Sequence, residues 1–143
     1  MTSSRLQNDA GHTQGARARR ILIADDDKSV AFTFQSALEL LPDCVVEIAT
    51  SGAEALRLFE SATFNVLITD YRMPDIDGMT LAVRIRQKYP LTAIVMITAF
   101  STLQLREQAA RIQIRKVLDK PVGLNQLRSV VREALEIPVR QSS

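Results

Sequence analysis

The sequence predicts an α/β fold, in which a parallel five-stranded sheet carries helices on both faces. Short apolar runs alternate five times with segments that have helical spacing. The central run, residues 66–68, consists of Val, Leu and Ile, which is typical of a parallel strand buried on both sides. Parallel strands need right-handed crossover connections, and helices supply them. The length of 143 residues and the 46% hydrophobic content suit one domain.

Two strand–helix units make up the first half of the chain. The strands are apolar runs, and the helices place apolar residues three and four positions apart. The first strand ends abruptly in Asp25, Asp26 and Asp27, and Pro42 stops the helix that follows. The predicted elements are a strand over residues 21–24, a helix over 29–41, a strand over 45–48 and a helix over 53–61.

Three further units complete the predicted sheet. The third strand, residues 66–68, presents Asp70 at its end, and Asp77 with Gly78 favours a turn after it. The helix after the fourth strand is more polar than the others, so its amphipathic pattern is weak. The remaining elements are a helix over residues 79–89, a strand over 93–97, a helix over 102–112, a strand over 116–119 and a helix over 124–136.

The charge and the single cysteine limit the function classes. Residues 1–20 predict a disordered basic tail, since they lack periodicity and carry four Arg against Asp9, which leaves residues 21–143 with 14 basic and 15 acidic groups. Four Arg without interleaved aromatic residues are more typical of a solvated segment than of a nucleic-acid site. Cys44 has no disulfide partner in the chain and is interpreted as a small apolar residue, which favours a cytoplasmic location. No apolar run approaches transmembrane length, and no signal peptide is expected.

Polar side chains of different kinds follow four of the five strands. They are Asp25 with Asp26, then Asp70, Thr98 and Lys120. Because carboxyl ends of parallel strands meet at one edge, these groups are expected to converge. In the strand order 2-1-3-4-5, strands one and four lie about 4.8 Å from strand three, and strand five lies about 10 Å away. A short threonine suffices on the neighbouring strand, whereas only a long side chain such as lysine reaches from strand five.

Three converging carboxylates indicate a bound cation, because otherwise they repel one another or must hold protons. Mg²⁺ is the expected ion, since it takes one or two carboxylates, keeps several waters and favours phosphate oxygens. With Lys120 and the Thr98 hydroxyl nearby, such a site could neutralise a tetrahedral dianion on one carboxylate. The predicted reaction is phosphoryl transfer to an aspartate, which gives an acyl phosphate that water later hydrolyses.

Each of these residues also has a simpler interpretation. Asp27 is predicted to cap the next helix. Asp70 alone could be a turn residue, and Asp75 and Asp77 are interpreted as turn residues. Lys120, which precedes a proline, could simply be solvated. The coincidence at four strand ends favours the functional interpretation.

Five segments resemble the receiver domain of two-component response regulators. They are IADDD at residues 23–27, ATSGAEAL at 49–56, LITDYRMPDIDG at 67–78, MITA at 96–99 and DKP at 119–121. The resemblance covers residues 21–137 and leaves residues 138–143 as a C-terminal tail. It implies a flavodoxin-like (βα)₅ fold, a doubly wound parallel sheet with strand order 2-1-3-4-5.

The resemblance also implies roles for these residues. Asp70 would accept a phosphoryl group from a sensor histidine kinase or a histidine phosphotransfer protein. Lys120 would pair with the phosphoryl oxygens, Thr98 would turn inward to hydrogen-bond them, and the bond from Lys120 to Pro121 would be cis. The implied Mg²⁺ ligands are Asp26, Asp70 and the main-chain carbonyl of Arg72, with Asp25 acting through water.

Two positions depart from the family pattern. Val117 stands where the family usually has an aromatic residue, and residues 112–114 replace the usual Gly-Ala. These changes concern the readout of phosphorylation, because valine cannot exchange a large exposed surface for a buried one. Phe100 is our hypothesis for that role, and Arg72 and Phe100 lie where the family tunes hydrolysis of the phosphoryl group.

Several contexts remain open for a receiver of this kind. The chain is not expected to be an enzyme or to bind nucleic acid or a membrane by itself, and a homodimer is compatible with it. It could act alone on a downstream protein partner, or form part of a larger transcriptional regulator. A Mg²⁺-dependent phosphatase resembling the haloacid dehalogenase family is a weaker alternative, because Arg72 replaces the acid expected two residues after Asp70. A flavin-binding module is weaker still, since no Ser/Thr-rich loop follows the first strand.

Overall fold

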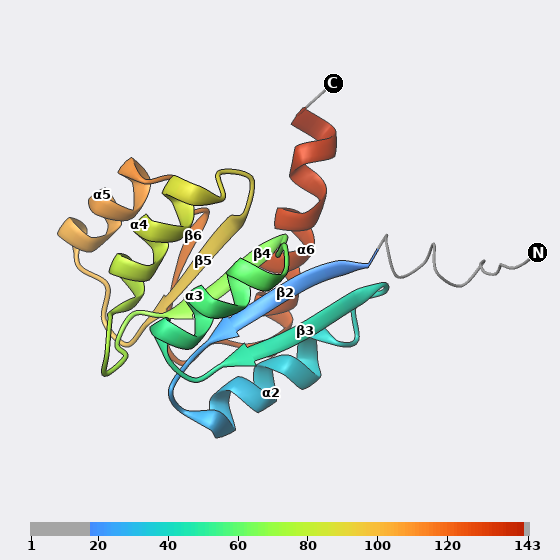
Figure 1. Cartoon of the computed structure of the whole chain (residues 1–143), viewed down its shortest axis with the longest axis horizontal. Coiled ribbons are helices and arrows are strands. Elements are labelled where there is room, and N and C mark those ends of the chain that lie inside the picture. Colours follow the sequence, from blue (N-terminus) through green and yellow to red (C-terminus); the bar gives the residue numbers. More distant parts are fainter. Residues whose placement is uncertain (1–17, 142–143) are drawn as a thin grey trace, which may run out of the picture.

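The computed structural model describes residues 18–141, in which five parallel strands alternate with five helices (Figure 1). The sheet order is β3-β2-β4-β5-β6, which confirms the flavodoxin-like fold and the predicted order 2-1-3-4-5 when strands are counted along the chain. The strands are β2 (Arg19–Ala24), β3 (Cys44–Ala49), β4 (Val66–Asp70), β5 (Ala93–Thr98) and β6 (Lys116–Asp119). The helices are α2 (Lys28–Leu38), α3 (Gly52–Ser61), α4 (Gly78–Lys88), α5 (Leu103–Arg111) and α6 (Leu124–Gln141).

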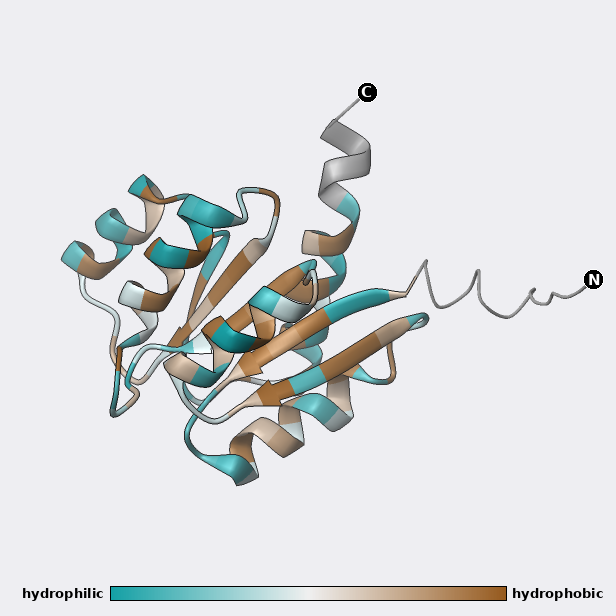
Figure 2. Cartoon of the chain, in the orientation of Figure 1, coloured by the Kyte–Doolittle hydropathy of each residue, from teal (hydrophilic) through white to brown (hydrophobic). Residues whose placement is uncertain are grey.

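Apolar side chains cover both faces of the sheet, because successive strand residues point to opposite sides. In β2, Ile21 and Ile23 pack in the layer that contains α2 and α6, whereas Leu22 and Ala24 pack in the layer with α3, α4 and α5. Figure 2 shows the hydrophobic residues concentrated along the strands in the middle of the molecule. The middle of the central strands is therefore mostly apolar, and the ends of the strands are where polar groups can gather.

The first strand begins at Arg19, so the predicted tail boundary at residue 20 is wrong for Arg19 and Arg20. Arg19 pairs with the first residue of β3, and Arg20 forms an ion pair with Glu47 on that strand. Backbone pairing and an ion pair keep these two residues in the sheet. A search for apolar runs does not detect either contact. The predicted disorder of residues 1–17 falls outside the described residues.

Two helix ends also differ from the prediction. Helix α2 ends at Leu38, three residues before the expected end, yet Leu41 is still buried at 5% exposure. Its apolar side chain continued the helical spacing although the backbone had already turned. Helix α6 continues to Gln141, beyond the expected end at residue 136, and the predicted boundary of the C-terminal tail at residue 138 stays a prediction. None of the helices described between residues 18 and 141 combines the length and apolar character needed to span a bilayer.

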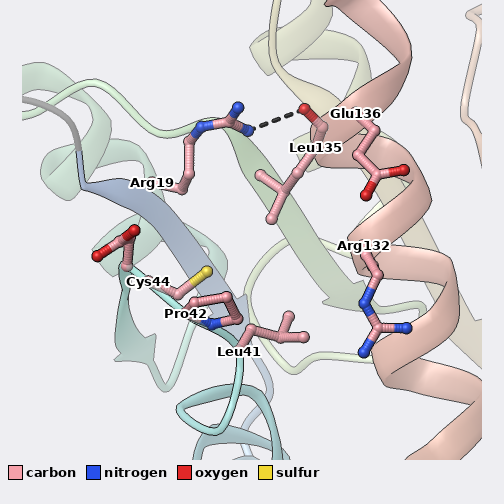
Figure 3. Close-up of a pocket in the computed structure, with 8 residues that line it drawn as sticks. Arg19, Leu41, Pro42, Cys44, Arg132, Leu135 and Glu136 are labelled. Atoms are coloured by element: carbon pink, nitrogen blue, oxygen red, sulfur yellow. Dashed lines mark hydrogen bonds between the residues drawn. The ribbon is translucent and has the colours of Figure 1, made fainter.

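A cavity of about 560 Å³ lies at the start of β2 and β3, the end of the sheet opposite Asp70 (Figure 3). There the Arg19 Nη1 donates to the carbonyl oxygen of Leu135 at 2.8 Å, which fastens the start of β2 to α6. Cys44 lines this cavity as a half-buried free thiol, and burial raises its pKa. The cavity is therefore separate from the predicted chemistry.

Candidate functional site

Strand register brings the predicted site residues to one edge of the sheet. Asp70 pairs with Ile97 on β5, so Thr98 follows one position beyond. Thr98 in turn pairs with Asp119 on β6, and Lys120 follows there. On the other side of Asp70, β2 stops one register position earlier, which places the acidic residues after it beside Asp70. Four strands thus carry the predicted groups to the same edge of the sheet.

Three carboxylates converge at this edge. Oxygen atoms of Asp25, Asp26 and Asp70 all lie within 4.8 Å of one another. Asp25 and Asp70 are buried, with 3% and 7% exposure, whereas Asp26 is exposed. A donor set made only of oxygen atoms suits a hard cation such as Mg²⁺ rather than a softer metal.

The charges of the cluster are only partly offset by the protein. The Lys120 Nζ lies 2.9 Å from the Asp70 Oδ1. Burial raises the pKa of Asp25; the N–H group of Asp27, which donates to its Oδ1 at 2.9 Å, opposes the rise, and the charge of Asp70 adds to it. Burial alone would lower the pKa of Lys120, but the hydrogen bond and charge of Asp70, with the charges of Asp25 and Asp26, raise it overall. One ammonium group balances one of three carboxylates, so the residues present fit a divalent cation.

Two other aspartates cap helices. The side chain of Asp27 accepts hydrogen bonds from the N–H groups of Ser29 and Val30 at the start of α2, which confirms its predicted capping role. The side chain of Asp77 accepts from the N–H group of Thr80 at 2.8 Å and caps α4. The loop after Asp70 therefore passes directly into a capped helix.

Asp75, which was predicted to be a turn residue, makes contacts that the sequence pattern does not reveal. Its Oδ1 accepts from the N–H group of Gly52 at 3.1 Å, and its Oδ2 accepts from the N–H group of Ala53 at 2.8 Å. The hydrogen bond to Ala53, followed by smaller contributions from nearby N–H groups, lowers the pKa of Asp75. No local pattern reveals such a contact, because the partners precede Asp75 by more than 20 residues.

The hydroxyl group of Thr98, the last residue of β5, makes hydrogen bonds with the loop that follows. The N–H group of Phe100 donates to the Thr98 Oγ1 at 3.3 Å, and the hydroxyl group donates to the Phe100 carbonyl oxygen at 3.4 Å. Thr98 is buried, whereas the Phe100 side chain is 77% exposed. Arg72 lies on the loop after β4, and together with Thr98 and Phe100 it lines a cavity of about 360 Å³. The main-chain role of Arg72 in metal binding stays a prediction.

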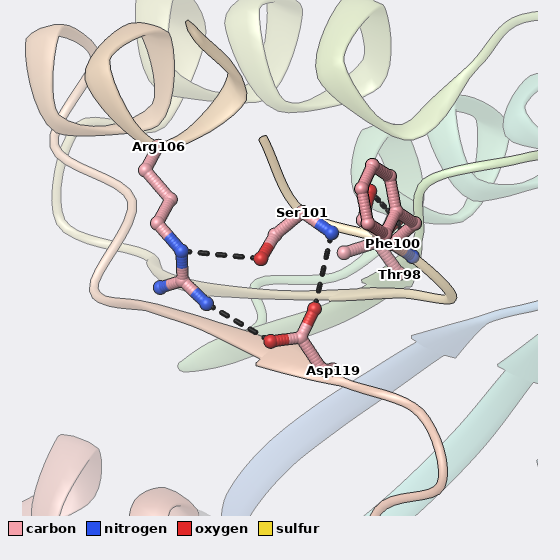
Figure 4. Close-up of polar contacts among 5 residues, drawn as sticks. All are labelled: Thr98, Phe100, Ser101, Arg106 and Asp119. Carbon is pink, nitrogen blue, oxygen red and sulfur yellow. Dashed lines mark hydrogen bonds and ion pairs between the residues drawn. The ribbon is translucent and has the colours of Figure 1, made fainter. Parts of the chain in front are cut away.

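A clamp of three residues, Ser101, Arg106 and Asp119, holds the loop that follows Thr98 (Figure 4). The Asp119 Oδ1 accepts from the N–H group of Ser101 at 3.1 Å, and its Oδ2 pairs with the Arg106 Nη2 at 3.0 Å. The Arg106 Nε donates to the Ser101 Oγ at 3.1 Å. Hydrogen bonding from Ser101 and the nearby Arg106 guanidinium lower the pKa of Asp119. Since Asp119 is the strand partner of Thr98 and precedes Lys120, the clamp joins two predicted site groups.

The two sequence features beside Lys120 are also visible. The Lys120-Pro121 peptide bond is cis, as the resemblance implied. Val117, which stands in place of the usual aromatic residue, is half-buried and packs in the layer with α3, α4 and α5.

Comparison with known sequences gives a consistent result. Residues 21–132 match a family model described as the response regulator receiver domain. Response regulator protein PilR of Pseudomonas aeruginosa is 32% identical over 119 residues, which are 83% of this chain and 26% of PilR. DNA-binding transcriptional regulator NtrC of Escherichia coli is 30% identical over 80% of this chain and 24% of NtrC. The chain therefore spans roughly a quarter of these relatives.

A shorter relative and two solved structures match over nearly their whole length. Response regulator receiver protein CpdR of Brucella abortus is 32% identical over 82% of this chain and 97% of CpdR. A CheY-like response regulator receiver domain protein from Methanospirillum hungatei has a TM-score of 0.82 and 27% identity, over 87% of this chain and 98% of that one. The signal receiver domain of an HD domain-containing protein from Pseudomonas fluorescens has a TM-score of 0.80 and 30% identity, over 87% and 99%.

Proposed function

Because this chain belongs to the response regulator receiver domain family, we propose that it is the phosphoacceptor of a two-component phosphorelay in the cytoplasm. Receiver domains in general have histidine kinase partners and are not ordinary enzymes. The donor here would be a sensor histidine kinase or a histidine phosphotransfer protein, and Asp70 would accept the phosphoryl group. The observation that carries the proposal is the surroundings of Asp70: its buried carboxylate lies 2.9 Å from the Lys120 Nζ and shares an oxygen cluster with Asp25 and Asp26.

The proposal includes Mg²⁺ at the acidic cluster. Asp26, Asp70 and the main-chain carbonyl of Arg72 would hold the ion directly, and Asp25 would act through water. When bound, the ion supplies positive charge that offsets the phosphoryl oxygens. The unbalanced carboxylates and the oxygen-only donor set support this assignment.

In the proposed transfer, a carboxylate oxygen of Asp70 forms a bond to phosphorus while the P–N bond of the donor phosphohistidine breaks. The electron pair of that bond stays on the imidazole nitrogen. Lys120 would pair with one phosphoryl oxygen, and Thr98 would hydrogen-bond another. In the later hydrolysis, the oxygen of a water molecule bonds to phosphorus, and Asp70 leaves as a carboxylate with inorganic phosphate as the other product.

The proposed readout passes through the loop that follows Thr98. A Thr98 hydroxyl group that turns toward Asp70 must give up its contacts with Phe100. Phe100 is exposed, and Val117 offers no large side chain to move, so Phe100 would present the phosphorylated state to a downstream protein partner.

Acetyl phosphate as phosphodonor tests the proposed function. With Mg²⁺, the intact mass of the wild type should increase by one phosphoryl group, and chelation of the metal should prevent the increase. Asp70→Asn should stay unmodified, because an amide cannot replace the carboxylate nucleophile. Asp77→Asn is the matched control, since it changes an aspartate of the adjoining loop that caps α4 and should be labelled like the wild type. Equal labelling of Asp70→Asn and wild type would refute the proposal.

A further inference from the structure

Backbone hydrogen bonds fix both ends of the segment between Asp70 and Gly78, the first end to the sheet and the second to Tyr71. The N–H group of Tyr71 donates to the carbonyl oxygen of Ile97 at 2.7 Å, and the N–H group of Gly78 donates to the carbonyl oxygen of Tyr71 at 2.7 Å. Residues 72–77 between these points belong to no helix or strand. Their path therefore depends on side-chain contacts.

Asp75 supplies such a contact near the middle of the segment. Its two carboxylate oxygens accept from the N–H groups of Gly52 and Ala53, the first two residues of α3. N–H groups at this position lack partners within the helix, and the helix dipole favours a negative charge there. The next residue, Ile76, packs so closely on Gly52 that a Cβ atom at position 52 would lie 2.2 Å from the Ile76 Cγ1. The segment and the helix therefore fit together at two successive residues.

Helix α3 already has a cap of its own. The Ser51 side chain accepts from the N–H group of Glu54 at 3.1 Å, and the Glu54 Oε1 accepts from the N–H group of Thr50 at 2.7 Å. The pattern is similar to a capping box, except that Glu54 accepts from the residue before the N-cap and not from the N-cap Ser51 itself. The contacts of Asp75 are additional to it, so their main effect is to hold the segment that Asp75 lies on.

We propose that Asp75 is a positioning residue, which holds residues 72–74 so that the carbonyl of Arg72 faces the acidic cluster. The inference rests on the proposed function, because it concerns the expected Mg²⁺ ligand on this segment. Asp75 is exposed and stands outside the group formed by Asp25, Asp26 and Asp70. It therefore acts through the backbone and not as a ligand.

Titration with Mg²⁺, followed by the backbone amide NMR signals of residues 25, 26 and 70–73, tests the inference. Asp75→Ala should raise the Kd for Mg²⁺ about tenfold, the lower end of the range for removing an outer partner of a metal ligand. Asp75→Asn should give a smaller rise, since the amide oxygen still accepts one hydrogen bond. In the metal-free protein, amide hydrogen exchange at residues 72, 73 and 75 should be faster in Asp75→Ala than in the wild type.

Two control variants separate positioning from charge and from helix stability. Asp77→Asn removes the same charge from the same segment and keeps the cap of α4, because asparagine is an equally good N-cap. Ser51→Ala weakens the cap of α3 without touching Asp75. Both should bind Mg²⁺ with a Kd close to that of the wild type.

Distinct results would overturn the inference and the proposed function. Unchanged Mg²⁺ affinity in Asp75→Ala, or an equal loss in either control, would overturn the inference alone. A wild type whose signals at residues 25, 26 and 70 ignore Mg²⁺ would overturn the proposed metal site and the inference with it. If Asp75→Ala does not fold, comparison of Asp75→Asn with Asp77→Asn decides: weaker binding in the first alone supports positioning, and equal binding overturns it.

Discussion

The surroundings of the Asp25 carboxyl group disfavour its ionised form. It is 3% exposed and lies beside Asp70, and its raised pKa reflects burial first, with the neighbouring charge as a smaller cause. A carboxylate whose pKa is higher in the folded protein adds stability at low pH, and this contribution disappears as the pH rises through the folded pKa. The metal-free protein should therefore be less stable at neutral pH than it would be with an uncharged side chain at position 25.

Asp25→Asn should relieve this effect. At pH 7 without metal, we expect the variant to have a free energy of unfolding about 0.5 to 2 kcal/mol above that of the wild type, as is common when a functional residue is replaced. The asparagine oxygen can still accept the hydrogen bond from Asp27. Urea unfolding at several pH values measures the difference, which should shrink as the pH falls toward the ordinary aspartate pKa of about 4. Glu60→Gln, an exposed acid on α3, should show no such trend, and a pH-independent difference for Asp25→Asn would contradict the explanation.

Phe100 should report phosphorylation. After treatment with acetyl phosphate and Mg²⁺, its ring NMR signals should shift, because in the proposed mechanism the Thr98 hydroxyl group would give up its contact with Phe100 for one near Asp70. The methyl signals of Leu91, which is 93% exposed, serve as the control and should stay in place. Phe100→Ala should still be phosphorylated but should alter which partner the phosphorylated form selects. An unshifted Phe100 ring in fully phosphorylated protein would refute this role.

At the scale of residues, the sequence predicts which side chains lie at the ends of strands. It does not predict which side chains contact a loop or helix that is distant in the chain. The common position of Asp70, Thr98 and Lys120 at one edge could be predicted because each lies at the end of a predicted strand or just beyond it, and a parallel sheet aligns such ends. Asp75 and Asp119 could not, because their partners are fixed only when separate elements pack. Asp119 is a strand residue in the pattern, and nothing there indicates that it also holds the loop after β5.

At the scale of elements, the loop between β4 and α4 closes against the strand that it leaves. A Cβ atom at Gly78 would lie 2.3 Å from the carbonyl oxygen of Asp70 and 2.9 Å from the Cα of Tyr71. Both contacts are with backbone atoms, which cannot move aside as a flexible side chain can. Glycine is needed here for close approach, since the chain gives it no positive φ angle.

Gly78→Ala should therefore destabilise the protein. We expect a loss of about 1 to 3 kcal/mol in the free energy of unfolding, which is typical of inserting an atom into a well-packed site. Gly123→Ala is the matched control, because a Cβ atom there would come no closer than 4.0 Å to Gln126, and it should cost less than about 1 kcal/mol. Urea unfolding of both variants gives the comparison. Equal stability of the two would show that the loop can relax at Gly78.

The elements themselves could be predicted better than their ends. Apolar periodicity located each of the strands and helices described between residues 18 and 141, because that periodicity records burial. The periodicity gave wrong ends where a residue is buried without belonging to the helix, or belongs to a strand without being apolar. Leu41 is buried outside the helix, and Arg19 belongs to a strand although it is polar.

At the scale of the whole molecule, the site draws on strands from both halves of the chain, so a cation bound there should stabilise the entire fold. A ligand that binds only the folded state adds RT ln(1 + [L]/Kd) to the free energy of unfolding, about 2.7 kcal/mol at a hundredfold excess over Kd. The melting temperature of the wild type should rise with Mg²⁺ concentration by several degrees, at about 2–4 °C per kcal/mol for a protein of this size.

Calorimetry or circular dichroism with increasing Mg²⁺ measures this shift, and EDTA should reverse it. Asp26→Asn, which removes one of the expected ligands, should show a much smaller rise. The control is Glu60→Gln, an exposed acid on α3, whose response should equal that of the wild type. A melting temperature that is indifferent to Mg²⁺ in the wild type would count against the metal site.

The sheet order also has a consequence for protein synthesis. Translation delivers Asp25, Asp26 and Asp70 early, whereas Lys120 arrives only after β6, the final strand, has been made. A nascent chain that has folded as far as β5 would hold the acids without their ammonium partner. Under the proposed function, the phosphoacceptor site would therefore be complete only when the last strand of the sheet has been added.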